Sequence, residues 1–183
     1  MGYALLILGL LAWSGSHVWK RVAPASRAGF GDKGRGLVAL ASFAGIVLMV
    51  LGYRWAPYDP VWPESNALRH VNNLLMLLAF YLFAAAGMKT AAARYIRHPQ
   101  LWGVRLWAIA HLMVNGDLAS FILFGGLLVW AQAEVALINR QEAWAPLGGK
   151  ASTGKEIGAV VGAVLVMGAV GWIHGMIGPW PFG

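Results

Sequence analysis

The sequence predicts an all-α polytopic membrane protein, a bundle of six transmembrane helices. Of its 183 residues, 59% are hydrophobic and only 11% are charged, and the mean hydropathy is +0.63. A soluble domain carries about a quarter charged residues. Most of the surface is therefore expected to face lipid, so the lipid bilayer is the first partner that the sequence predicts.

The apolar residues form separate runs, each close to the ~20 residues that a helix needs to cross a bilayer. The first run is followed, not preceded, by basic residues, which predicts a retained span rather than a cleaved signal peptide. The fourth run is the shortest. We expect the six runs to build a single domain, 1–183, with spans over 2–19, 36–53, 70–88, 100–115, 118–137 and 157–178.

Basic residues between the runs predict the topology. All but two of the 14 lysines and arginines lie in, or just beyond, the first, third and fifth connections. The exceptions, Arg54 and Arg69, lie on the opposite side. The positive-inside rule therefore places three basic connections in the cytoplasm and both termini outside. These charges also account for the net charge of +7 without a nucleic-acid surface.

The sixth run is rich in glycine. Small residues at four-residue spacing allow another helix to approach closely. We therefore expect this span to pack inside the bundle, or against a second copy or a partner subunit, through Gly158, Gly162, Gly168, Gly171 and Gly175.

His17 lies about one turn inside the cytoplasmic end of the first span. A histidine in a lipid-embedded segment is costly and calls for a functional explanation. Arg21 follows four residues later, so it lies on the same helical face. An imidazole that ligates iron, with a cation placed to meet the propionates, is one way in which proteins hold haem b.

A second histidine, His111, lies in the fourth span. Trp107 precedes it by four residues and Asn115 follows it by four, so all three share a face. Gly116 is expected to take the left-handed conformation that ends a helix, and Asp117 to cap the next helix. We interpret Asn115-Gly116-Asp117 mainly as a turn, which leaves His111 itself unexplained.

Cations lie at the entry of the fourth span and within it. Arg97 and His98 stand at the expected cytoplasmic headgroup level, as anchors or as functional groups. Arg105 lies deeper in the span, where a cation requires a partner. A haem propionate or a lipid phosphate would be a suitable anionic partner for Arg105.

Several of these segments together resemble the NnrU family. The resemblance covers nearly the whole chain and is most specific in its centre. It rests on Arg97-His98-Pro99 with Gly103, on Leu106–Leu112, on Asn115–Ser120 and Leu123–Gly126, and on Ser16-His17 and Trp172-Ile173-His174 at the two ends.

The resemblance implies a cofactor, because this family is related to 15-cis-zeta-carotene isomerase, a membrane enzyme that contains haem b. It implies that His17 and His111 are the iron ligands, and we expect them to be the catalytic residues. From their positions and charge, we expect Arg21, Arg97 and Arg105 to bind the cofactor. The resemblance also implies the inner (cytoplasmic) membrane of a bacterium. In the isomerase, a cysteine three positions before the second histidine has been proposed as an alternative ligand. That position is Ala108 here, and the chain has no cysteine.

Three functions are compatible with the sequence, and whether the protein is an enzyme stays open. The first is a haem-dependent cis–trans isomerase of a hydrophobic polyene, as in carotenoid biosynthesis. The second is a haem-based sensor or accessory protein of nitrite and nitric oxide metabolism, that is, of denitrification. The third is a structural membrane subunit without a cofactor.

The depths of the histidines leave a second pairing open. His111 lies roughly 18 Å along its helix from Pro99 at ~1.5 Å per residue, whereas His17 is about one turn from the cytoplasmic edge. His70, at the outer start of the third span, is therefore an alternative partner for His111. The resemblance favours His17.

Overall fold

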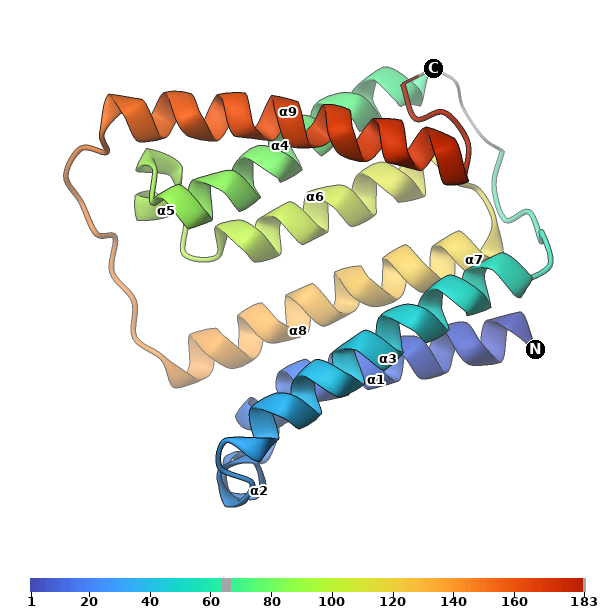
Figure 1. Ribbon diagram of the computed structural model, residues 1–183, viewed down its shortest axis with the longest axis horizontal. Helices are drawn as coiled ribbons and strands as arrows, with labels where there is room; N and C mark the ends of the chain where they lie inside the picture. The colour runs from blue at the N-terminus through green and yellow to red at the C-terminus, as the bar shows by residue number, and fades with distance from the viewer. Residues whose placement is uncertain (64–66, 183) are drawn as a thin grey trace. The chain divides into compact units, whose positions relative to one another are not determined.

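The structure, a computed structural model, describes residues 1–63 and 67–182. It is all-helical, with 79% of the residues in helices (Figure 1). The elements are α1 (Gly2–Val22), α2 (Pro24–Gly29), α3 (Lys33–Trp55), α4 (Leu68–Met88), α5 (Ala91–Tyr95), α6 (Pro99–Val114), α7 (Leu118–Ser120), the π-helical turn η1 (Phe121–Gly125), α8 (Gly126–Gln141) and α9 (Thr153–Ile177).

Every predicted span forms a helix, and five of the six are long and apolar enough to cross a membrane. Three of these are α1, α3 and α4, the fourth is the continuous run Leu118–Gln141, and the fifth is α9. The sixth predicted span, 100–115, forms α6, which has only 16 residues. That is slightly shorter than the ~17–25 residues usual for a transmembrane helix. The count of six spans stays a prediction.

The chain separates into two compact units, each built from two stretches of sequence. The first unit contains Met1–Pro63 and Asn115–Ile138, and the second contains Glu64–Val114 and Asn139–Gly183. The expectation of a single domain stays a prediction, and each unit is described by itself.

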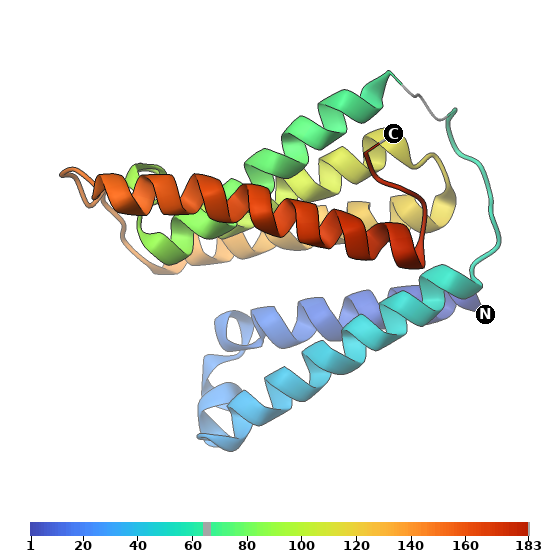
Figure 2. The same ribbon diagram turned by 45° about the horizontal axis from the view of Figure 1, so that its top comes forward.

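In the first unit, α1 packs against α3, and the two helices lie closest where α1 begins and α3 ends (Figure 2). A Cβ atom added to Gly9 would lie 2.7 Å from both the carbonyl oxygen of Gly45 and the amide nitrogen of Met49. Only glycine leaves room for such an approach. Close helix packing through small residues therefore occurs in this hairpin. The sequence had led us to expect such packing only in the sixth run.

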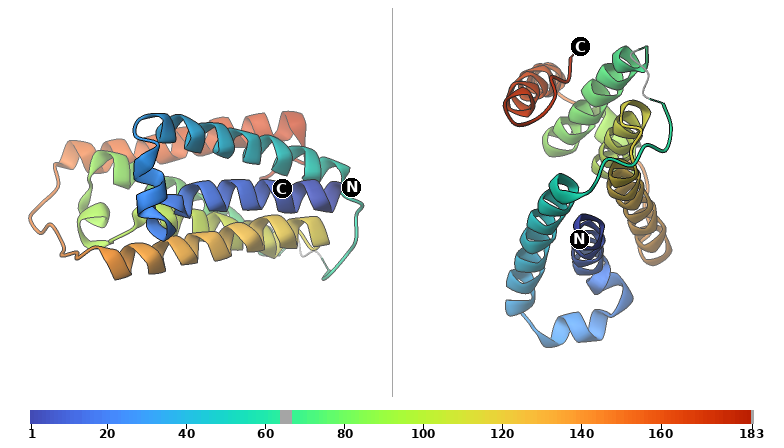
Figure 3. Two further views of the ribbon diagram at one scale, coloured as in Figure 1. Left: turned by 90° about the horizontal axis from the view of Figure 1, so that it is seen from below. Right: turned by 90° about the vertical axis from the view of Figure 1, so that its right-hand side faces the viewer.

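The other neighbour of α1 in the first unit is the continuous helix of η1 and α8. Figure 3 shows α1 between α3 and α8. A Cβ atom on Gly126 would lie 2.8 Å from Leu10 Cδ1, which places the start of α8 against α1. The helices α1 and α8 run in the same direction (Figure 1), and Trp130 of α8 contacts the rings of Trp13 and His17 of α1.

The turn before α7 is fixed by backbone pairing rather than by a left-handed glycine. The carbonyl oxygen of Gly116 accepts hydrogen bonds from the amides of Val61, at 2.7 Å, and Trp62, at 3.1 Å. The expectation of a left-handed Gly116 is wrong, because its φ is not positive. Glycine is required there because the carbonyl of Trp62 occupies the space that a Cβ atom would need.

Asp117 caps the helix that follows, as predicted. Its Oδ1 accepts from the Ser120 amide at 2.9 Å, and its Oδ2 accepts from the Ser120 hydroxyl at 2.6 Å. The Tyr53 hydroxyl lies 2.8 Å from the same Ser120 oxygen. This network joins α3 to the start of the α7–η1–α8 helix and explains the buried aspartate structurally.

In the second unit, α4 packs against both α6 and α9. A Cβ atom on Gly103 of α6 would lie 2.9 Å from the Phe83 ring and 3.1 Å from the carbonyl oxygen of Ala79. In α9, Gly158 faces Met88, whereas Gly162 and Gly168 have nothing within 4 Å of an added Cβ atom. The glycine-rich helix thus contacts α4, and its expected partner subunit or second copy stays a prediction.

Candidate cofactor site

His17 is held by its own helix in one tautomer. Its Nδ1 lies 2.8 Å from the carbonyl oxygen of Trp13, one turn earlier. Because a carbonyl oxygen can only accept, Nδ1 carries the proton and the neutral ring keeps its lone pair on Nε2. The Ser16 hydroxyl donates to the same Trp13 oxygen at 2.8 Å.

Aromatic rings surround His17 within the first unit. The Trp13 ring lies 4.2 Å from the imidazole between centroids, and the Trp130 ring of α8 lies 5.2 Å away in an edge-to-face arrangement. The indole N–H groups of both tryptophans are buried and have no hydrogen-bond partner among the described residues. Such orphaned donors in a site are a sign of an absent acceptor.

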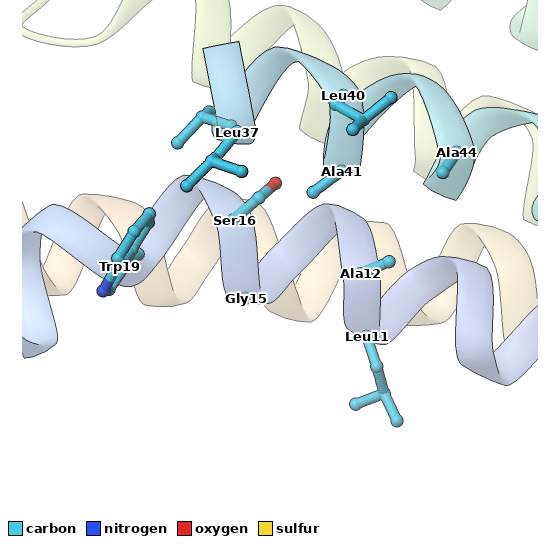
Figure 4. Close-up of a pocket in the computed structure, with 10 residues that line it drawn as sticks. Leu11, Ala12, Gly15, Ser16, Trp19, Leu37, Leu40, Ala41 and Ala44 are labelled. Carbon is cyan, nitrogen blue, oxygen red and sulfur yellow. The ribbon is translucent and has the colours of Figure 1, made fainter. Parts of the chain in front are cut away.

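A groove on the first unit starts beside this cluster. It has a volume of about 470 Å³ and lies between α1 and α3 (Figure 4). Its walls are apolar except for Ser16, whose Oγ is 3.4 Å from His17 Nδ1. The groove is wide because small residues line its middle, namely Ala12, Gly15, Ala41 and Ala44.

His111 repeats the arrangement of His17 on α6, in the second unit. Its Nδ1 lies 2.8 Å from the carbonyl oxygen of Trp107, one turn earlier. The Trp107 ring lies 5.2 Å from the imidazole between centroids. The neutral ring therefore also keeps its lone pair on Nε2.

This shared arrangement is the one that metal-binding histidines require. A ligating imidazole almost always donates its second N–H to a carbonyl or carboxylate, which fixes the tautomer and the ring orientation. In both His17 and His111 that donor is Nδ1 and the acceptor is a backbone carbonyl. In each neutral ring, Nε2 is therefore the nitrogen that carries the lone pair a metal would use.

The other histidines lie in different surroundings. His98 uses Nε2, 2.8 Å from Asn139 Oδ1, so the nitrogen that would bind a metal is occupied. His174 lies 2.8 Å from the carbonyl oxygen of Pro179 in the C-terminal tail. His70, the alternative partner considered for His111, is exposed.

Arg105 is the buried cation of the second unit. Only 8% of the residue is exposed, and its Nε and Nη2 atoms have no hydrogen-bond partner among the described residues. Its Cζ atom lies 4.7 Å from the centre of the Trp102 ring. A cation–π contact supplies attraction but no acceptor for the N–H groups, so a carboxylate or phosphate would complete this site.

The two other arginines considered for cofactor binding have different positions. Arg97 donates through Nη2 to the carbonyl oxygen of Glu142, and so holds the residue after α8 against the entry of α6. Arg21 lies one turn beyond His17 on α1, as the spacing predicts. The pairing of His17 in the first unit with His111 in the second stays a prediction.

The sequence interpretation missed two residues around His17 and one buried acid on α8. Trp13 and Trp130 form the aromatic cluster described above. Glu134 is 7% exposed and lies one turn after Trp130 on α8. Two signals in the sequence could have identified these residues. The first is that Trp13 precedes His17 by four residues, as Trp107 precedes His111. The second is that Glu134 is a single acid inside an otherwise apolar run.

The comparisons with known proteins identify the family. The family model described as NnrU protein matches residues 5–181, which is nearly the full length. No curated protein and no solved structure matches this chain. The chain belongs to the NnrU family.

Proposed function

Because the chain is an NnrU-family protein with two identically prepared histidines, we propose that it is an integral membrane protein that binds haem b through His17 and His111. We further propose that it catalyses cis–trans isomerisation of a long hydrophobic polyene in the bilayer. The observation behind the first proposal is the pair of 2.8 Å contacts that leave each Nε2 unprotonated.

The cations fit the acidic groups of the same cofactor. Haem b carries two propionates, and a buried guanidinium without an acceptor suits a carboxylate. Arg105 supplies such a guanidinium on the helix of His111. Arg21 supplies a second cation on the helix of His17. Arg97 is a weaker candidate, because it is bonded to the backbone of Glu142.

The groove on the first unit supports an apolar, chain-like substrate. It opens along candidate membrane spans, where a polyene dissolved in lipid has access. Its single polar lining residue, Ser16, precedes His17, so a chain in the groove lies beside the proposed ligand. The rest of the lining is largely apolar, which favours an apolar substrate over a hydrophilic one.

In this proposal the protein contributes positioning and exclusion of water. The Trp13 and Trp107 carbonyls hold the imidazoles, the arginines hold the propionates, and the groove walls orient the polyene. A haem held by these residues would supply iron able to donate electron density to a double bond and so ease rotation about it. A cysteine thiolate plays no part, because the chain has no cysteine.

An absorption spectrum tests the cofactor. Protein purified from haem-replete cells is expected to show a Soret band and one haem b per chain. His17→Ala and His111→Ala should each remove the band or reduce it severely. His98→Ala is the matched control and should keep it. A colourless wild-type protein would refute the proposal.

Co-expression with enzymes that accumulate a poly-cis carotene tests the reaction. The wild-type protein should shift the product absorbance toward the all-trans form, and His111→Ala should not. A haem-containing protein that leaves the carotene unchanged would instead favour the sensor function. In that case nitric oxide should change the spectrum of the reduced protein.

A further inference from the structure

Glu134 is a buried acid that the proposed function leaves without a role. It is the only Asp or Glu in the run Leu118–Gln141, and only 7% of the residue is exposed. Its carboxyl forms no hydrogen bond or ion pair with the part of the chain that the structure describes. An acid that is largely buried in an apolar run carries a desolvation cost, so Glu134 calls for a functional explanation.

The position of Glu134 directs it toward His17. Trp130 precedes it by four residues and so lies on the same face of α8. Helical side chains lean toward the turn N-terminal to their own Cα atom, which brings the carboxyl over Trp130. The Trp130 ring is 5.2 Å from the His17 ring. Glu134 lies one helical turn, ~5.4 Å, beyond Trp130 along α8. Its carboxyl is therefore expected roughly 10 Å from the His17 imidazole.

Each of the two helices that form this cluster carries a charge one turn further along the chain. Glu134 lies one turn after Trp130 on α8, and Arg21 lies one turn after His17 on α1. Lys20 is its neighbour on α1. The part of α3 that crosses here, around Ser42, is uncharged. A cation and an anion thus flank the His17 cluster.

We propose that Glu134 is an electrostatic tuning residue that lowers the reduction potential of haem bound at His17. This inference rests on the proposed function. The ferric haem core carries one more positive charge than the ferrous core, so a nearby carboxylate stabilises the oxidised form. A unit charge at roughly 10 Å and an effective dielectric constant of about 20 changes the reduction equilibrium by about tenfold. Arg21 acts on the same equilibrium with the opposite sign.

A spectroelectrochemical titration of the purified haem protein tests the role of Glu134. Dithionite and mediators deliver one electron to the ferric iron, and no bond to the protein is made or broken. Glu134→Gln is expected to favour reduction by about tenfold, a positive shift of ~59 mV for one electron. Glu134→Asp keeps the charge and should stay close to the wild-type potential. Glu142→Gln, an exposed acid just after the same helix, should leave it unchanged.

Two further results separate the inference from its alternatives. Arg21→Gln should shift the potential in the negative direction, and the double variant with Glu134→Gln should lie between the two single variants. An intact Soret band with the same potential in Glu134→Gln and wild type would overturn the role of Glu134 while leaving haem binding in place. Absence of haem from the wild-type protein would overturn the proposed function itself.

Discussion

The helices that carry His17 and His111 hold the imidazole ring in the same way but in different surroundings. In both, a tryptophan four residues earlier accepts the imidazole N–H at 2.8 Å. Helix α1 is long, and its histidine is packed by a second tryptophan from α8. Helix α6 has 16 residues and a buried arginine without an acceptor. The ligand geometry is thus local, whereas the charge and packing around each ligand come from distant segments.

The largest expected difference between the two helices concerns their backbone packing. In α1, Gly9→Leu forces a side chain into the backbone of α3, so we expect a loss of stability above ~3 kcal/mol and loss of haem. In α6, Gly103→Ala meets the movable Phe83 ring as well as the Ala79 carbonyl, and about 1 kcal/mol is expected. Thermal unfolding in detergent measures both.

A matched control for the glycine variants is Gly162→Ala in α9, where nothing lies within 4 Å of an added Cβ atom. This variant should unfold at the wild-type temperature. Equal tolerance of Gly9→Leu and Gly162→Ala would contradict the close packing of α1 on α3.

The next difference concerns the cation on the helix of His111. Arg105→Gln removes a buried charge that we assign to a haem propionate, and charge-assisted hydrogen bonds contribute ~1.5–3 kcal/mol. Haem affinity should therefore fall by about tenfold or more. Arg105→Lys should restore only part of it, because an ammonium cannot replace the planar guanidinium fork. Haem titration of the apoprotein measures the change.

An unchanged haem affinity in Arg105→Gln would show that the guanidinium serves a lipid phosphate or the fold instead. The exposed Arg35→Gln is a suitable control, since Arg35 faces solvent beside Asp32.

The smallest expected difference concerns the tryptophan rings. Trp13→Leu and Trp107→Leu both keep the backbone carbonyl that binds the imidazole. They remove ring contacts worth ~0.5–1.5 kcal/mol each. Trp13 contacts His17 at 4.2 Å and also contacts Trp130, whereas Trp107 lies 5.2 Å from His111. Trp13→Leu should therefore weaken haem retention more, as measured by the rate of haem transfer to apomyoglobin. The opposite order would contradict the assigned role of the aromatic cluster.

The sequence was sufficient for the features that depend on neighbouring residues. The apolar runs predicted all the long helices, because a membrane span is recognised by its length and hydropathy. The cap by Asp117 followed from its place before an apolar run. The position of Gly116 was also recognised as special, but the reason was wrong, because the Trp62 carbonyl that excludes a side chain comes from a distant loop.

Features that depend on contacts between distant segments were not predictable in this way. Nothing near His17 in the sequence indicates that Trp130 packs against it, and nothing near Trp130 indicates that the apolar groove between α1 and α3 lies beside the same histidine. Glu134 was visible as an isolated acid, but its burial on the face of Trp130 required the helix packing. The glycines of α9 were prominent in the sequence, yet the close backbone approach of two helices occurs between α1 and α3, at Gly2, Gly9 and Gly52.

Electron paramagnetic resonance of the oxidised protein tests ligation by His17 and His111 most directly, because it reports the axial ligands of ferric haem. The account predicts the low-spin signal of two imidazole ligands in the wild-type protein. It predicts a high-spin signal, or loss of haem, in His17→Ala and in His111→Ala, with the wild-type signal retained in His98→Ala. A low-spin signal that survives in either of the first two variants would contradict it.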